Sequence, residues 1–328
     1  MKKIVFLFIA LIAMSQNVCA QGMTATLQSG DNLSVLYGVN AFINAYAEAK
    51  DGDQITLSAG TFNAPEGSIT KSVKITGVGA YEETGNTVFE SLTVSGTDNR
   101  IEGIKFSKIL YASNSKNLIV ARCWIEKLDA SSNYTNPLFR ECVIKVPANF
   151  KYARDFTIMN CTISQFFGTN NSDEENVGNI LNTVIYEWNG AIGRVPYAIY
   201  KNCLMGHNDN FALTDASRQL QLNKPSEFYY NVGFKNGGYY NPVFKVVNDC
   251  ISVNNQILSF ESLFNNTESY PAKPQNAPTG DDGTVVGPYG GTGFSEYPAI
   301  PRIISKDIDG KTNDDGKINV KIEVKAEN

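Results

Sequence analysis

The sequence predicts an all-β protein in which short strands coil into a parallel β-helix. Two observations carry this prediction: apolar positions recur every 19 residues, and apolar and polar residues alternate within each repeat. No helical period separates the repeats, so each strand is expected to pair with its counterpart in the next turn, ~4.8 Å along the axis. The three apolar columns are Ile101, Val120, Phe139, Ile158; then Ile104, Cys123, Cys142, Cys161; and then Phe106, Ile125, Ile144, Ile163.

The repeat continues toward the C-terminus with insertions between turns. With the first column as the reference, later turns follow at intervals of 22, 20, 29 and 18 residues. The reference positions of these turns are Ile180, Tyr200, Tyr229 and Val247, and three residues later come Thr183, Cys203, Val232 and Cys250. The alignment therefore predicts a long cysteine column in which a few small or branched residues replace cysteine.

The cysteines of this column are expected to be buried thiols that pack as small apolar residues. A disulfide between neighbours is an alternative, but five cysteines follow Cys19, and an odd number leaves one thiol over. A zinc site needs clustered Cys and His ligands, and the single histidine, His207, lies outside the column. We therefore expect no metal at this column.

A further column, two residues after each reference position, predicts the bend between two strands. Asn is frequent in it and Gly occurs once, and both accept left-handed backbone conformations. Its members are Gly103, Arg122, Glu141, Asn160, Asn182, Asn202, Asn231 and Asp249. We interpret the column as an asparagine ladder at a tight turn.

The N-terminal part predicts a helix that caps the first turn and ends at Asp51-Gly52. The residues with helical spacing are Val39, Phe42, Ile43 and Tyr46. With this helix and the turn column, the chain resembles the right-handed parallel β-helix proteins of the pectate-lyase-like class over roughly residues 24–290. The resemblance implies a right-handed, single-stranded solenoid. It implies no single activity, because this fold hosts lyases, hydrolases, adhesins and scaffolds.

The C-terminal tail departs from the repeat and predicts a β-hairpin. Apolar residues alternate with polar ones over 317–325, and the Asn313–Gly316 turn joins this strand to the segment PAIPRIISKDI. A lone hairpin is unstable in water, so the tail is expected to cover an apolar outward column or to cap the open end of the solenoid. That column is Trp124, Val143, Val184, Leu204 and Ile251. High strand propensity alone is the alternative explanation of the alternation.

Residues 1–20 have the pattern of a secretory signal peptide. Lys2 and Lys3 precede a short apolar run, and small residues end at Ala20. Lipid attachment at Cys19 is an alternative form of processing. The predicted division is a signal peptide over 1–20, the β-helix over 21–290 and the hairpin tail over 291–328. The expected location is periplasmic, on the outer-membrane surface or extracellular. The tail also resembles the ends of other secreted β-helix proteins from polysaccharide-using bacteria.

Charge and hydropathy exclude two classes of partner. The formal charge of −5 becomes −7 when Lys2 and Lys3 are removed with the leader, and no basic stripe is present, so nucleic-acid binding is not expected. No apolar run after the leader is long enough for a transmembrane helix. The oligomeric state is left open by the sequence.

The longest insertions are the candidate functional loops, because binding residues often lie on loops that a rigid scaffold positions. They span 166–176, 186–197 and 207–225, and all fall at the same point of the repeat. An indole stacks on a sugar ring, and arginines bind carboxylates. The predicted ligand-binding residues are Trp188, Arg194, His207, Asp209 and Arg218. An ordinary solvated loop surface is the alternative.

Three functions are consistent with these residues. The first is a secreted or surface carbohydrate-binding or adhesive module without catalysis, whose partner is a polysaccharide or cell-surface glycan. The second is a lyase or hydrolase acting on uronic-acid polymers, with Arg194 and His207 as catalytic candidates and Ca²⁺ at Asp173–Glu175. The third is an envelope scaffold. We favour the first, since the sequence lacks a paired-acid motif and calcium-loop spacing, and no cofactor is required.

Overall fold

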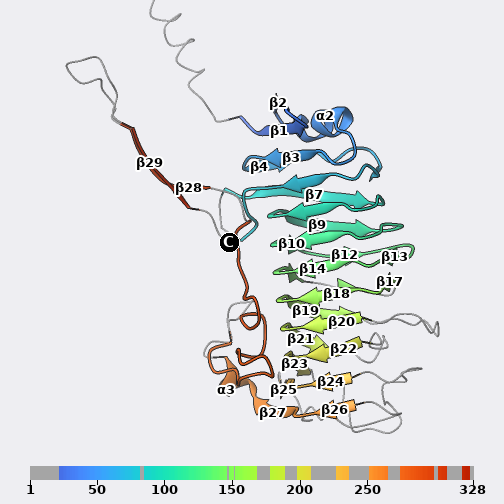
Figure 1. Ribbon diagram of the computed structural model, residues 1–328, viewed down its shortest axis with the longest axis vertical. Coiled ribbons are helices and arrows are strands. Elements are labelled where there is room, and N and C mark those ends of the chain that lie inside the picture. Colours follow the sequence, from blue (N-terminus) through green and yellow to red (C-terminus); the bar gives the residue numbers. More distant parts are fainter. Residues whose placement is uncertain are drawn as a thin grey trace, which may run out of the picture.

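The computed structural model describes residues 22–81, 85–145, 148–150, 152–167, 178–188, 198–207, 227–235, 251–264, 274–298, 302–308 and 320–325. These residues form a solenoid of stacked parallel strands, which confirms the predicted all-β parallel β-helix (Figure 1). Two helices occur in the described part, α2 (Ala41–Glu48) at the N-terminal end of the stack and α3 (Phe260–Leu263) near the other end.

One face of the solenoid is a sheet of twelve strands, here called the first sheet. From β3 to β26 its strands pair in parallel, whereas β1 is antiparallel to both of its neighbours. In spatial order the strands are β2 (Asn32–Tyr37), β1 (Thr24–Ser29), β3 (Gln54–Leu57), β6 (Lys74–Thr76), β8 (Arg100–Glu102), β10 (Ile119–Ala121), β14 (Leu138–Arg140), β18 (Thr157–Met159), β20 (Gly178–Leu181), β22 (Ala198–Lys201), β24 (Glu227–Tyr229) and β26 (Ile251–Val253).

The second sheet has thirteen strands and also pairs in parallel. Its main path runs β15 (Val143–Ile144), β11 (Trp124–Ile125), β9 (Lys105–Ala112), β12 (Leu128–Asp129), β16 (Ala148–Asn149), β19 (Thr162–Phe167), β21 (Val184–Trp188), β23 (Leu204–His207), β25 (Val232–Lys235) and β27 (Gln256–Ser259). β7 (Thr87–Val94) lies beside β9, and β4 (Gly60–Phe62) and β5 (Ser68–Ile69) pair with the other edge of β7. A small parallel pair is formed by β13 (Tyr134–Thr135) and β17 (Ala153–Arg154).

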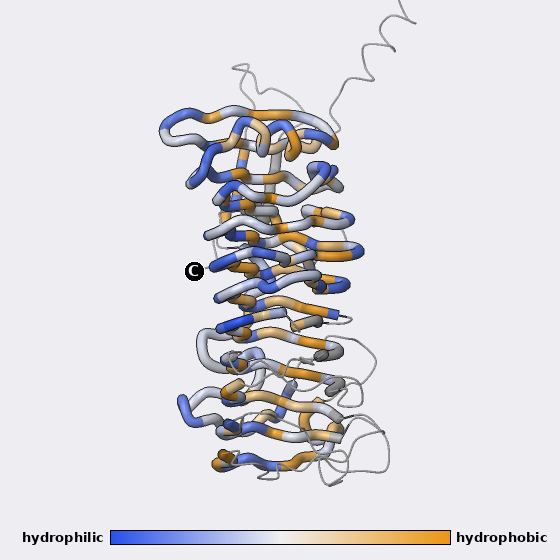
Figure 2. Tube along the Cα trace, turned by 90° about the vertical axis from the view of Figure 1, so that its right-hand side faces the viewer, coloured by the Kyte–Doolittle hydropathy of each residue, from blue (hydrophilic) through white to orange (hydrophobic). Residues whose placement is uncertain are grey.

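The predicted columns form the core in the predicted register. Val120 pairs with Ile101 and Phe139, and Phe139 pairs with Ile158. All four side chains are fully buried. Figure 2 shows the consequence along the stack, where hydrophobic stretches recur at matching places in successive coils. Burial of apolar area at ~25 cal/mol per Å² is the main favourable term, because a short strand of two or three residues has little stability alone.

From β8 to β22, the residue after each strand of the first sheet bends the chain with a positive φ. Gly103, Arg122, Glu141, Asn160, Asn182 and Asn202 have φ between 44° and 66°. The predicted tight turn is therefore confirmed over six coils. We call these six positions the turn column.

A second left-handed ladder lies at another corner and was not predicted. Asp98, Asn117, Asn136 and Asp155 have φ between 52° and 58° and recur every 19 residues. Their exposed side chains bond along the axis: the Asn117 amide donates to Asp98, and the Asn136 amide donates to Asn117. This ladder is the closer match to a stack of asparagine side chains.

The predicted register is wrong in the last two described coils. Tyr200 pairs with Phe228, not with Tyr229, and Phe228 pairs with Ser252. As a result Asn231, not Val232, occupies the cysteine column, and Ile251 belongs to a strand of the first sheet. Phe228 and Tyr229 are both aromatic and follow a long insertion. The alternation of apolar and polar residues therefore could not show which of the two points into the core. Val247, Asp249 and Cys250 lie outside the described residues.

Residues 274–298, here called the strap, run back along the solenoid beside the turn column (Figure 1). Val286 is buried in a cluster with Val184, Leu204 and Val232 of the outward column and with Phe264. Val143 is also fully buried. The strap thus removes from water an outward stripe of the second sheet whose apolar side chains would otherwise be exposed over several coils.

The strap is held by side chains of the turn column. Asn160 donates to the carbonyls of Pro288 (2.9 Å) and Gly290 (2.6 Å) and accepts from the Thr292 hydroxyl (3.1 Å). Asn202 donates to Asp281 (2.9 Å), and its carbonyl accepts from Gly287. Glycine is needed where the strap approaches the turn column, since a Cβ on Gly290 would lie 2.7 Å from the Asn182 amide nitrogen and closer still to the Val285 carbonyl of the strap itself. The turn column therefore forms a polar track for the strap.

The C-terminal strands form an antiparallel pair beyond the strap. β28 (Arg302–Ile308) pairs with β29 (Val320–Lys325) with one bulge, and the pair points away from the solenoid (Figure 1). Val320, Ile322 and Val324 on β29 are 55%, 50% and 55% exposed. The segment that covers the outward column is therefore the strap, whereas the apolar face of β29 remains open to solvent.

Asn160→Ala should loosen the strap. Three hydrogen bonds are lost, each worth ~1 kcal/mol net, and two buried carbonyls lose their donor. We expect faster amide exchange and faster proteolysis over 274–298, and a loss of about 2–3 kcal/mol in the free energy of unfolding. Asn136→Ala is the matched control, since it removes another left-handed asparagine that does not touch the strap. Equal effects of the two substitutions would show that backbone conformation, not strap contact, is responsible.

Candidate functional site

The predicted loop residues cannot be placed from the described part of the chain. Arg194, Asp209 and Arg218, and also Asp173–Glu175, lie outside the described residues. The backbones of Trp188 and His207 are described, at the ends of β21 and β23, but their side chains are not. The structure therefore brings together the points from which the loops leave, and the ligand-binding prediction stays a prediction.

These departure points share one corner of the solenoid. β19, β21, β23 and β25 are consecutive neighbours in the second sheet, and the strands that follow the loops, β20, β22, β24 and β26, are consecutive neighbours in the first. Trp188 pairs with Phe166, which pairs with Ala148, and Ala148 pairs with Leu128, a fully buried residue. By register, the backbone position of Trp188 continues the column of Leu128.

The described residues contain a different aromatic and basic cluster, on the outer side of the second sheet. Trp124 pairs with Lys105 on β9 and with Val143 on β15. The ammonium nitrogens of Lys105 and Lys145 lie 5.7 Å and 5.1 Å from the indole centroid. Both distances are within the range of a cation–π contact. All three side chains are partly exposed.

Neighbouring groups fix the Trp124 ring. Its Nε1 donates to Glu126 Oε1 at 2.7 Å, and Lys145 Nζ lies 3.6 Å from the same oxygen. Tyr81 contacts the indole edge-on, with ring centroids 6.0 Å apart. The Tyr81 hydroxyl donates to the carbonyls of Cys123 and Glu141, and burial holds the pKa of this phenol well above its usual value. The indole is thus a rigid, half-buried platform flanked by two cations.

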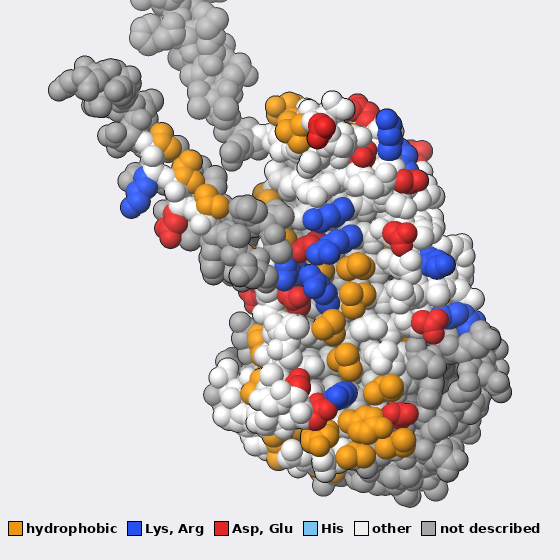
Figure 3. All heavy atoms as spheres, viewed as in Figure 1, with side chains coloured by type: hydrophobic (Ala, Val, Ile, Leu, Met, Phe, Trp, Pro, Cys, Tyr) orange, Lys and Arg blue, Asp and Glu red, His pale blue; other side chains and the backbone are white. Residues whose placement is uncertain are grey.

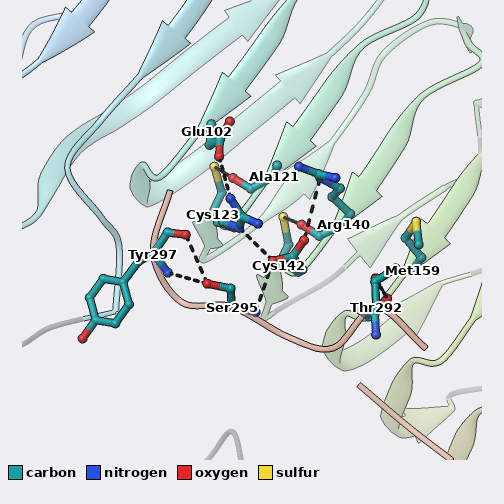
Figure 4. A network of polar contacts seen from close by, with 12 residues as sticks. Glu102, Ala121, Cys123, Arg140, Cys142, Met159, Thr292, Ser295 and Tyr297 are labelled. Carbon is teal, nitrogen blue, oxygen red and sulfur yellow. Dashed lines mark hydrogen bonds and ion pairs between the residues drawn. The ribbon is translucent and has the colours of Figure 1, made fainter. Parts of the chain in front are cut away.

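A buried charge network joins Glu102 of β8 to Arg122 and Glu141 of the turn column. Arg122 donates to Glu102 at 3.0 Å and to Glu141 at 2.7 Å. All three residues are less than 10% exposed. Figure 4 shows how the strap completes the network, with the backbone of Ser295 donating to Glu141 at 3.1 Å. Buried charges require partners, so these contacts make the network a structural element and not a free acid–base pair.

The cysteine column is a second hydrogen-bonded element that the sequence reasoning missed. Each thiol donates to a carbonyl in its own turn, from Cys123 to Ala121 at 3.2 Å and from Cys203 to Lys201 at 3.3 Å. The backbone N–H of a column residue also donates to the side chain of the column residue in the following coil. These pairs are Cys142 to Cys161, Cys161 to Thr183, Cys203 to Asn231 and Asn231 to Asn255. The cysteines of this column therefore form hydrogen bonds in addition to packing as small apolar residues.

The four described cysteines are free and buried, and they form no disulfide. Burial raises the pKa of the Cys123 and Cys161 thiols, and raises that of Cys203 to about 12. The thiols of these three cysteines are therefore protonated at neutral pH. Among the residues that the structure describes, no group of three His, Cys, Asp or Glu side chains is arranged to hold a metal ion.

In the part of the chain that is described, no helix has the length and apolar character needed to cross a bilayer. Comparisons with known proteins give no relative: no family model matches the chain, and no curated protein matches it.

Arg122→Met should be strongly destabilising. Removal of the guanidinium leaves Glu102 and Glu141 buried without their shared cation, which typically costs about 3–5 kcal/mol. Urea denaturation measures the loss. The control is Arg100→Met, which removes a more exposed cation from the same Glu102 and should cost below about 1 kcal/mol. Adding Glu102→Gln and Glu141→Gln to Arg122→Met should restore part of the stability, and no restoration would contradict the assignment.

Alkaline pH should destabilise the protein partly through Cys203. The folded pKa of about 12 exceeds the unfolded value of about 8.5, so the stabilising contribution is complete below pH 8.5 and falls as pH rises toward 12. Between pH 7 and 10 this thiol should account for a loss of about 2 kcal/mol in unfolding free energy.

Cys203→Thr tests this dependence, since threonine occupies the same column at Thr183 and does not ionise. Denaturant titrations at pH 7 and 10 should show a smaller pH effect in this variant. The same pH dependence in both proteins would contradict the role of the thiol. In the wild-type protein, the four thiols should react with a thiol reagent only after unfolding.

Proposed function

We propose that the protein is a secreted or cell-surface carbohydrate-binding β-helix protein, and that Trp124 with Lys105 and Lys145 forms a glycan-binding surface. The observation that carries the proposal is the partly exposed indole held between two ammonium groups. An aromatic face stacks on the apolar face of a sugar ring, and lysines bind anionic groups as point charges.

The surroundings support binding without catalysis. A sugar ring could displace one lysine from the face of the Trp124 indole, while Glu126 and Tyr81 hold the indole in place. Such preorganisation lowers the entropy cost of binding, because the platform does not have to order itself. The lysine pair favours sugars that carry carboxylate or sulfate groups. The resemblance to pectate-lyase-like β-helices is in keeping with a polysaccharide ligand, and the signal peptide predicted over 1–20 supports a location where such polymers occur.

The loop corner is a second surface within the same proposal. In the sequence, Trp188 and His207 end the adjacent strands β21 and β23, and Arg194, Asp209 and Arg218 follow them in the chain; all five remain the predicted ligands there. A lyase or hydrolase activity would place Arg194 and His207 at the reaction centre. The experiment separates the cases: residues 21–328 are incubated with acidic and neutral polysaccharides, with and without Ca²⁺, and both gel retardation and glycan length are measured.

Retardation without shortening is the expected result, and shortened glycans would make the protein an enzyme. Retardation by no polymer in the panel would overturn the proposal and favour a scaffold role.

Trp124→Ala should weaken glycan binding about tenfold or more, because a stacked aromatic contributes about 1 kcal/mol beyond its buried area. Lys145→Gln should weaken the binding of acidic polymers and leave that of neutral ones unchanged. Lys127→Gln is the matched control, since this lysine lies in the same coil as Trp124 but pairs with Asp129. Affinity electrophoresis in a salt series measures all three. If Trp124→Ala left the glycan affinity unchanged and Arg194→Ala abolished it, the binding site would lie on the loops 186–197 and 207–225 and not at Trp124.

A further inference from the structure

The two ends of the first sheet are free edges. β2 is the outermost strand at the N-terminal end and β26 at the other, and within the described residues each pairs with one strand only. A terminal strand presents unpaired N–H and C=O groups, so it is a template for pairing with another chain.

Neither edge carries the usual protection against pairing. The sequences Asn-Leu-Ser-Val-Leu-Tyr of β2 and Ile-Ser-Val of β26 contain no charged residue and no proline. Their apolar side chains are unusually exposed: Leu33 is 66%, Val35 46%, Tyr37 72%, Ile251 43% and Val253 37% exposed. Natural sheets block edges of this kind with lysine, proline, bulges or a covering segment.

Strand direction makes the two edges compatible. β1 is antiparallel to both β2 and β3, so β2 runs parallel to β3. The pairings from β3 to β26 are all parallel, and β2 therefore has the same direction as β26. A second copy shifted along the axis would offer its β2 to β26 in the same parallel arrangement that the solenoid uses internally.

The side chains also match in face. Ala25 and Leu27 of β1 are buried and pair with Leu36 and Ser34, so the alternate residues Leu33, Val35 and Tyr37 lie on the outer face. Ile251 and Val253 end an apolar band on the outer face of the first sheet, seen as the orange band in Figure 3. The other members of the band are Ile119, Leu138, Met159, Leu181, Ile199 and Tyr229. Stacking would continue this band from one copy into the next.

Core-type residues are exposed at both ends as well. Ile257 continues the inward column of Ile185 and Met205 through Gly233, yet it is 44% exposed. Val39, beside the N-terminal helix, is 47% exposed. These are positions that another coil would cover.

We propose that copies of this chain associate head to tail, with β26 of one copy pairing in parallel with β2 of the next. The contact is heterologous and relates the copies mainly by translation, so it does not close into a ring and builds linear assemblies. The proposal is independent of glycan binding, because it uses the ends of the solenoid and not the Trp124 surface.

Purified residues 21–328 should show concentration-dependent growth in sedimentation velocity, and electron microscopy should show rods joined end to end. Val35→Lys and Ile251→Glu should each raise the dissociation constant about tenfold or more, since each places an unpaired charge in an apolar contact. The double variant carries opposite charges at the two edges and should recover association at low salt. Leu138→Lys is the control, because it lies in the same band far from either end.

Three results would overturn the proposal: a monomer at every concentration, loss of association in Leu138→Lys equal to that in the end variants, or a double variant no better than the single ones. Deletion of residues 299–328 tests the β28–β29 pair as another occupant of the β26 edge. Association that survives this deletion supports β2 as the occupant, and association lost with it overturns that assignment.

Discussion

From β8 onward, each coil turns out of the first sheet at a residue with positive φ, and much of the structure follows from that bend. The left-handed conformation points the side chain of this residue outward, while the next backbone N–H points into the solenoid. The inward N–H needs an acceptor, because an unpaired buried donor costs about 1–3 kcal/mol. Cys161, Thr183, Asn231 and Asn255 supply that acceptor from the following coil. Each bend therefore requires one acceptor side chain in the next coil, and this is why the cysteines recur at the same interval as the bends.

The outward side of the same bend explains the strap. Asn160 and Asn202 present amide groups at regular spacing, and residues 274–298 use them as donors and acceptors in place of a sheet partner. Where the turn column changes to Arg122 and Glu141, the side chains pair with each other and with Glu102. The strap can then cover Val184 and Leu204 while turn-column side chains bond to part of its backbone, which links the bend, the apolar stripe and the C-terminal segment.

The sequence was sufficient for features that repeat and insufficient for features that occur once. Ile101, Val120, Phe139 and Ile158 reveal the register because the same constraint acts on every coil. At Phe228 a long insertion removes the interval, and hydrophobicity alone cannot distinguish two adjacent aromatic residues. The Trp124 cluster was also missed as a candidate site, since Lys105 and Lys145 become neighbours of Trp124 only through pairing across coils. Lys105 and Lys145 are 19 and 21 residues from Trp124, and no short sequence motif joins residues at such separations.

In a solenoid built by pairing strands between coils, the first and the last strand of each sheet have an edge without a partner. Along its length every edge is satisfied by the next coil, and the strap protects the outward stripe of the second sheet. The two end strands lack a partner on one side, and β2 has the direction of the internal strands and an apolar outer face. A cap that blocked stacking would be expected to carry charge or proline, and β2 has neither. The N-terminal strand pair therefore covers the core of its own chain while leaving an edge on which another coil can be added.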